Sequence, residues 1–100
     1  MSREEVFERE SDLTKIVEQE GAKFIVNEIV ILFRDETTIN DLFGVADLVN
    51  GRLTGFLPGL GVAKIEVLAE NIQELNDLIN RIKNSGNLFI EDVLPNILIL

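Results

Sequence analysis

The chain lacks three side chains on which much enzyme chemistry depends, because it has no cysteine, no histidine and no tyrosine. Without cysteine it can form neither a disulfide nor a thiolate metal site, although this absence does not choose a cellular compartment. Its only serines are Ser2, Ser11 and Ser85, and no imidazole base is present to activate them. Carboxylates such as Asp35 and Glu36 belong to a charged turn rather than an apolar pocket, which suits acid–base catalysis poorly. We therefore expect a protein that is not an enzyme and that needs no cofactor or metal ion.

Basic residues are also scarce, with 9 Lys and Arg against 18 Asp and Glu, which gives a formal net charge of -9. Such a charge repels phosphate backbones and anionic membranes, so we expect neither a nucleic acid nor a membrane as partner. No stretch of the chain approaches the roughly 20 apolar residues of a membrane-spanning helix. The opening residues, MSREEVFERE, do not have the apolar core of a signal peptide. If the protein is exported, its signal has been removed.

The length and composition of the chain predict one folded domain. Hydrophobic residues make up 46% of the 100 residues, and only 2 prolines are present. This apolar content is enough to offset the entropy of an ordered chain, which argues against disorder. The length is close to that of one typical domain and leaves no room for a second core.

The first segment of the chain has the signals of a helix. Ser2 and Glu5 have the spacing of a capping box. A narrow apolar stripe continues to about Glu20 and is made by Val6, Leu13, Ile16 and Val17. We therefore predict an N-terminal helical extension over residues 1–22, followed by the main unit over residues 23–100.

The first half of the main unit predicts a strand and a helix. The run FIVNEIVILFRD, from Phe24, is rich in β-branched and aromatic residues and has apolar side chains on both faces. A helix is then predicted, capped by Thr37 or Thr38 and ended by Gly51.

The second half predicts a hairpin, a helix and a last strand. Two short β-type runs, Arg52 to Leu57 and Val62 to Leu68, are joined by the turn sequence PGLG. A helix opens at Asn71, with Glu74 at its third position, and the segment NLFIEDVLPNILIL supplies the final strand and a tail. This order of elements predicts an α+β, ferredoxin-like βαββαβ fold, in which two helices cover one face of a four-stranded antiparallel sheet.

The other face of that sheet should be polar, but the alternation of side chains makes it apolar. Six residues are assigned to the helix side, namely Ile29, Ile31, Phe33, Ala63, Ile65 and Val67. That assignment leaves Val30, Leu32, Phe56 and Val62 on the other face. An apolar face needs a cover, which could be the N-terminal helix, a second copy of the chain or a different protein.

Three segments of the sequence carry a resemblance to a known family. They are NEIVILFRD from Asn27, NGRLTGFLPGLGVAKIEV from Asn50 and IEDVLPN from Ile90. In order and spacing they resemble the first strand, the central hairpin and the last strand of the prodomain of subtilisin-like serine proteases. The resemblance covers about Phe24 to Leu100, and the hairpin is its most specific part.

The resemblance implies a binding protein that assists the folding of its own protease and then remains as a tight inhibitor. It implies that the open sheet face docks on two parallel helices of the protease, through Val30, Leu32, Phe56 and Val62. It also implies that acids near the last strand, Glu66, Glu91 and Asp92, meet the N-termini of partner helices. The family more often has an aromatic residue in place of Asp92. Such a domain would be secreted with its protease, whereas a stand-alone inhibitor could be cytoplasmic.

The end of the chain has two interpretations. Under the family resemblance, Ile97, Leu98, Ile99 and Leu100 lie in the active-site cleft, with Ile97 and Leu100 as anchors, because an extended segment can add to an exposed strand edge. Alternatively, these residues extend the last strand of the domain itself. The acids could likewise be solvated surface charges. The whole domain could instead be a self-associating or small-molecule-binding module of ferredoxin-like fold, which would form a homodimer through the same face.

Overall fold

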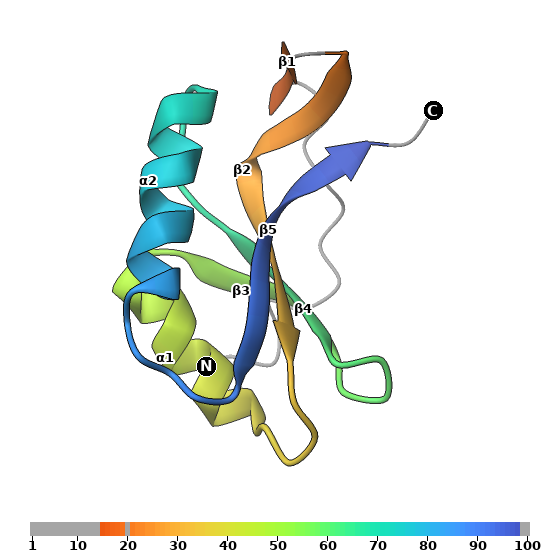
Figure 1. Cartoon of the computed structure of the whole chain (residues 1–100), viewed down its shortest axis with the longest axis vertical. Coiled ribbons are helices and arrows are strands. Elements are labelled where there is room, and N and C mark those ends of the chain that lie inside the picture. Colours follow the sequence, from red (N-terminus) through yellow and green to blue (C-terminus); the bar gives the residue numbers. More distant parts are fainter. Residues whose placement is uncertain (1–14, 20, 99–100) are drawn as a thin grey trace.

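The computed structural model describes residues 15–19 and 21–98 of the chain. Two helices lie together on one side of a twisted sheet (Figure 1). In chain order the elements are β1 (Ile16–Gln19), β2 (Ala22–Phe33), α1 (Ile39–Leu48), β3 (Arg52–Leu57), β4 (Val62–Glu66), α2 (Ile72–Lys83) and β5 (Ile90–Leu98).

Strand β2 is the centre of the sheet, because β1, β4 and β5 all pair with it in antiparallel fashion. Residues Ile29–Leu32 have partners in both β4 and β5, so these two strands lie on opposite edges of β2. Strand β3 follows beyond β4. The predicted α+β class with an antiparallel sheet and two helices is confirmed, and the arrangement is compatible with a ferredoxin-like fold. Within the described residues the sheet has five strands rather than the predicted four.

The additional strand lies where a helix was predicted, so that prediction is wrong over β1. Strand β1 forms a hairpin with the start of β2, in which Ile16 faces Ile25 and Gln19 faces Ala22. Gly21, with φ of +83°, makes the tight turn between them, a backbone conformation that glycine adopts without strain. The apolar stripe of this segment is narrow, so a helix here would gain little stability from packing. As a strand, the segment instead pairs its backbone with that of β2. The rest of the predicted helix lies outside the described residues.

Local capping explains where both helices begin. The Oγ1 of Thr38 accepts from the backbone N–H of Asp41 at 3.2 Å, and Asp41 Oδ2 accepts from the N–H of Thr38 at 2.9 Å. This reciprocal pair is a capping box, which satisfies backbone donors that a helix leaves open. At α2, Asn71 Oδ1 accepts from the N–H of Glu74 at 2.9 Å. Both starts agree with the sequence-based predictions.

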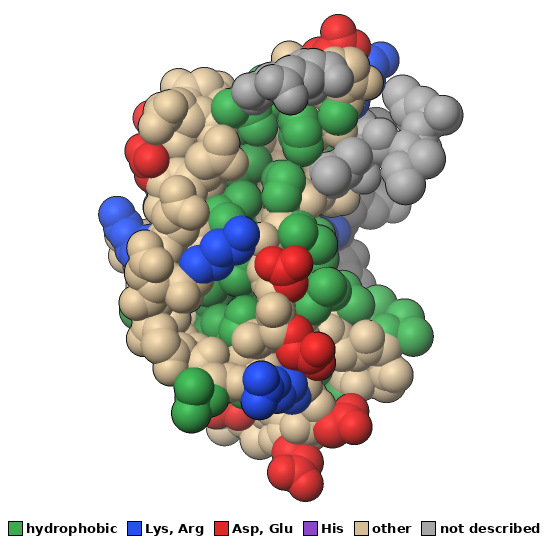
Figure 2. All heavy atoms as spheres, in the orientation of Figure 1, with side chains coloured by type: hydrophobic (Ala, Val, Ile, Leu, Met, Phe, Trp, Pro, Cys, Tyr) green, Lys and Arg blue, Asp and Glu red, His purple; other side chains and the backbone are tan. Residues whose placement is uncertain are grey.

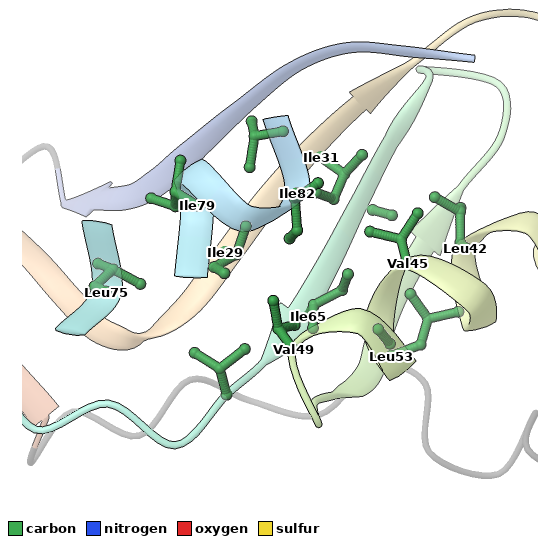
Figure 3. Close-up of a cluster of buried hydrophobic side chains, with 14 of the residues drawn as sticks. Ile29, Ile31, Leu42, Val45, Val49, Leu53, Ile65, Leu75, Ile79 and Ile82 are labelled. Carbon is green, nitrogen blue, oxygen red and sulfur yellow. The ribbon is translucent and has the colours of Figure 1, made fainter. Parts of the chain in front are cut away.

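The hydrophobic core lies between the sheet and the two helices. All six residues predicted for the helix side of the sheet are buried. Figure 3 shows Ile29, Ile31 and Ile65 of the sheet, with side chains of α1 and α2 around them. Helix α1 contributes Leu42 and Val45, and α2 contributes Leu75, Ile79 and Ile82.

Gly51, between α1 and β3, is a position where even one added methyl group is expected to destabilise the domain. A Cβ atom there would lie 2.7 Å from the backbone oxygen of Glu66 and 2.7 Å from Cγ2 of Ile65. Neither atom is the end of a flexible side chain, so Gly51→Ala should reduce the free energy of unfolding by about 1–3 kcal/mol. Urea denaturation followed by circular dichroism measures this change.

Gly44 offers a matched control for this substitution. It lies within α1, and an added Cβ would meet nothing within 4 Å. Because alanine favours helix over glycine, Gly44→Ala should leave stability unchanged or raise it by about 0.5–1 kcal/mol. Equal stability of the Gly51→Ala domain and the original would show that the backbone moves to accept the methyl group.

Candidate functional site

The face of the sheet away from both helices is the candidate functional surface, and we call it the open face. Cross-strand partners in an antiparallel sheet share a face, so the register defines the members of this surface. Its apolar members are Val30, Leu32, Leu57, Val62 and Leu94, and its charged members are Glu28, Arg52, Lys64, Glu66 and Asp92. Figure 2 shows the molecule from the side, in the orientation of Figure 1, with apolar side chains down the middle of the view and acidic and basic groups among them toward its lower half.

Three of the four apolar residues predicted for the open face lie on it. Val30 sits between Lys64 of β4 and Leu94 of β5, while Leu32 lies opposite Val62 of β4. Val30, Leu32 and Val62 are each half-buried. The structure therefore brings these three together on adjacent strands, while their role in docking stays a prediction.

Phe56 is a correction to the sequence-based assignment, because its side chain lies on the helix side. Its Cα partner is Ala63, which is buried in the core, and its ring stacks on that of Phe33 with centroids 5.7 Å apart. The cause is a register shift between Leu53 and Gly55. A bulge inserts one residue and moves every following side chain to the opposite face.

Leu57 and Leu94 are the apolar open-face residues that sequence reasoning missed. Because of the bulge, Leu57 rather than Phe56 lies opposite Val62, and its side chain is 52% exposed. Leu94 is the partner of Val30 on β5 and is also exposed. Glycine in a strand often marks a bulge, so Gly55 was the one available signal for the flip.

A shallow hollow of about 310 Å³ lies on the open face near the β3–β4 hairpin. Its lining is mainly apolar, and its polar residues are Thr54, Lys64 and Asn96. Gly55 forms part of the lining, and a Cβ on it would approach Cβ of Lys64 to 3.3 Å. The hollow is at the small end of the range for ligand pockets, about 300–1,000 Å³, and its volume suits one large side chain of a partner.

A buried carboxylate connects three strands at the open face. Glu28 of β2 is only 2% exposed. Its Oε1 accepts from Nδ2 of Asn96 on β5 at 2.6 Å, and its Oε2 lies 3.7 Å from Nζ of Lys64 on β4. A buried charge is tolerated when it is paired and hydrogen-bonded in this way. Nothing in the sequence-based reasoning singled out these three residues.

The predicted acidic residues are not gathered into one group. Glu66 is half-buried and lies opposite Glu28 and Arg52, whereas Asp92 lies opposite Leu32, toward the other end of β2. Asp92 is exposed, and its Oδ1 accepts from the N–H of Val93 at 2.8 Å. Glu91, next to Asp92, is exposed as well and lies at a register shift in β5. The acids therefore occupy both ends of the open face.

The tail is in part a strand of the domain. Ile97 lies opposite Phe24, and Leu98 lies opposite Lys23. As far as Leu98, the tail therefore extends the last strand of the domain, as in the second of the two interpretations. Ile99 and Leu100 lie outside the described residues.

Compared with protein families, curated proteins and solved structures, the chain matches none of them. Within residues 15–19 and 21–98, no group of three or more acidic, histidine or cysteine side chains could hold a metal ion. None of the helices in this part of the chain has both the length and the apolar character needed to cross a bilayer.

Proposed function

We propose that this chain is the prodomain of a subtilisin-like serine protease, acting as an intramolecular chaperone and then as a tight-binding inhibitor. The observation that carries the proposal is the apolar open face, which lies on the side of the sheet away from both helices. Apolar side chains gathered on a protein surface mark interaction sites, and here charged residues such as Lys64 lie among them. The choice of partner rests on the three segments that resemble such prodomains.

In this proposal the ferredoxin-like unit consists of β2, α1, β3, β4, α2 and β5, and β1 is an addition at the start of β2. The order along the chain supports this assignment, as do the antiparallel pairs of β5 with β2, β2 with β4 and β4 with β3. The unit places both helices on one face and leaves the other face for the protease.

Docking would place two helices of the protease across the open face. A stable interface of this kind buries about 800 Å² on each partner, and buried anchors in well-packed pockets supply most of the binding energy. The hollow beside Leu57 and Val62 would hold one such anchor. Glu66 and Asp92, at opposite ends of the face, would each meet the N-terminus of a partner helix, where free N–H groups favour carboxylates.

Binding of this kind can also assist folding. A ligand that binds the native protease but not its unfolded chain stabilises the native form by about 4 kcal/mol at a thousandfold excess over Kd. Linkage in one precursor raises the effective concentration further. The domain would then act where its protease matures, outside the cell.

The domain is expected to inhibit subtilisin, and removal of residues 97–100 should weaken that inhibition about tenfold or more, because tail anchors would be lost. Hydrolysis of a chromogenic peptide measures the inhibition constant, and urea denaturation shows whether the shortened domain stays folded. The yield of refolded subtilisin with and without the domain tests the chaperone activity.

Two outcomes would contradict the proposal. Equal refolding yields would exclude chaperoning, and absence of inhibition would exclude the prodomain role. A stable dimer that buries the open face would favour the self-associating module instead. Sedimentation would detect the dimer, and slower exchange of backbone amide hydrogens on that face would show that the face is buried.

A further inference from the structure

Strand β5 consists of two runs that pair with different parts of β2. Residues Ile90–Pro95 face Ile29–Phe33, whereas Asn96–Leu98 face Lys23–Ile25. Between these runs β2 has three residues, 26–28, with no partner on β5, although Pro95 and Asn96 are adjacent in the chain. Proline also has no N–H to donate to the ladder. The pairing of β5 is therefore interrupted just before its last three residues.

The two runs are held by different contacts. In the first run, Val93 is buried in the core, and Ile90 packs against the core. In the second run, the Nδ2 of Asn96 donates to the buried Oε1 of Glu28 at 2.6 Å. The Nζ of Lys64 on β4 lies 3.7 Å from the other carboxylate oxygen of Glu28. This ion pair also helps to hold the Glu28 side chain in place. A hydrogen bond to a charged group is about twice as strong as a neutral one.

We propose that Glu28 and Asn96 form a latch, which holds residues 96–98 along β2 and must open before the tail can enter a protease cleft. The regulatory part of this inference rests on the proposed function. Adjacent strands lie only about 4.8 Å apart, so a narrow cleft cannot enclose the tail while β2 lies against it. The interruption before Asn96 allows the second run to leave while the first run stays in the core.

The latch would make the domain a weaker inhibitor than the same domain with its tail already released from β2. When only a fraction of the molecules has the binding-competent conformation, the apparent affinity falls by that fraction. Opening of the latch should therefore strengthen inhibition, and locking it should weaken inhibition. Asn96 is in this sense a positioning residue for the tail.

Exchange of backbone amide hydrogens in the free domain tests the latch without any protease. Asn96→Ala should raise the exchange rates of residues 96–98 about tenfold or more, because the bond to the buried carboxylate is lost. Exchange in the first run of β5 should not change. Asn80→Ala, at an exposed position of α2, is the matched control and should leave all these rates unaltered. Unchanged exchange in Asn96→Ala would overturn the latch.

A reversible cross-link tests the effect on inhibition. The chain has no cysteine, and Lys23 and Leu98 are partners across the ladder, so the pair Lys23→Cys and Leu98→Cys would tie the tail to β2 by a disulfide. The oxidised domain should inhibit subtilisin at least tenfold more weakly than the same domain after reduction. The control pair, Glu18→Cys with Lys23→Cys, joins β1 to β2 and should show no such difference.

The results separate the latch from the proposed function. Equal inhibition by the oxidised and reduced tail-linked domain would overturn the requirement for opening. If no form of the domain inhibits subtilisin while exchange still responds to Asn96→Ala, the proposed function fails, and with it the regulatory part. In that case the hydrogen bond between Glu28 and Asn96 holds residues 96–98 along β2 but has no role in inhibition.

Discussion

Leu57→Asp is expected to weaken inhibition of subtilisin about a hundredfold or more, a size typical of losses at buried interface anchors, while the domain stays folded. Leu57 lies on the open face opposite Val62 and lines the hollow. Its side chain is 52% exposed in the free domain, so a carboxylate there remains hydrated until a partner binds. Docking would then bury an unpaired charge, which is strongly unfavourable. The inhibition constant measures the loss.

Leu88→Asp is the matched control for this substitution. Leu88 is 84% exposed and precedes β5, outside the open face. The two variants make the same change in side chain and net charge, so a general effect of charge would appear in both. Equal weakening by Leu57→Asp and Leu88→Asp, or no weakening by either, would contradict docking through the open face.

Ile65→Ala is expected to reduce the free energy of unfolding by about 2–5 kcal/mol, the range for truncation of a large buried aliphatic side chain. Ile65 is fully buried on β4, where it lies between Ile29 of β2 and Leu53 of β3. It belongs to the core cluster that the sheet forms with α1 and α2 (Figure 3), so the site cannot collapse easily. Since a domain of this size has only about 5–15 kcal/mol of stability, the change should be visible in any denaturation curve.

Leu88→Ala serves as the control for this prediction, since Leu88 is exposed and surface changes usually remain within about 0.5 kcal/mol. Unfolding in urea with an unchanged slope would assign the effect of Ile65→Ala to the native core. A loss below about 1 kcal/mol would mean that neighbouring side chains refill the space.

Sequence patterns predicted the parts of this fold that local interactions decide. Thr38 and Asn71 cap their helices through bonds to residues three positions later, and such spacings are readable in a sequence. The buried positions of β4, and those of β2 from Ile29 to Phe33, alternate as in a regular strand. For the same reason Val30, Leu32 and Val62 were placed on the correct face.

Tertiary pairing overruled the pattern in two places. Ile16 and Val17 belong to an apolar stripe at helical spacing, yet they form β1 because the start of β2 lies beside them. Phe56 has the alternation of an open-face residue, yet the bulge before it turns its ring toward Phe33. A register depends on the partner strand as well as on the segment itself.

The sequence by itself determined the α+β class, the helix starts, the hairpin and most of the core, because each follows from contacts within a few residues or from simple periodicity. Only the tertiary structure decided that Leu57 rather than Phe56 lies on the open face, that Glu28 is buried against Asn96, and that the tail runs along Lys23–Ile25 through Leu98. These features join residues far apart in the chain. Their geometry depends on how the strands meet, and Gly55 was the one local signal of it in the sequence.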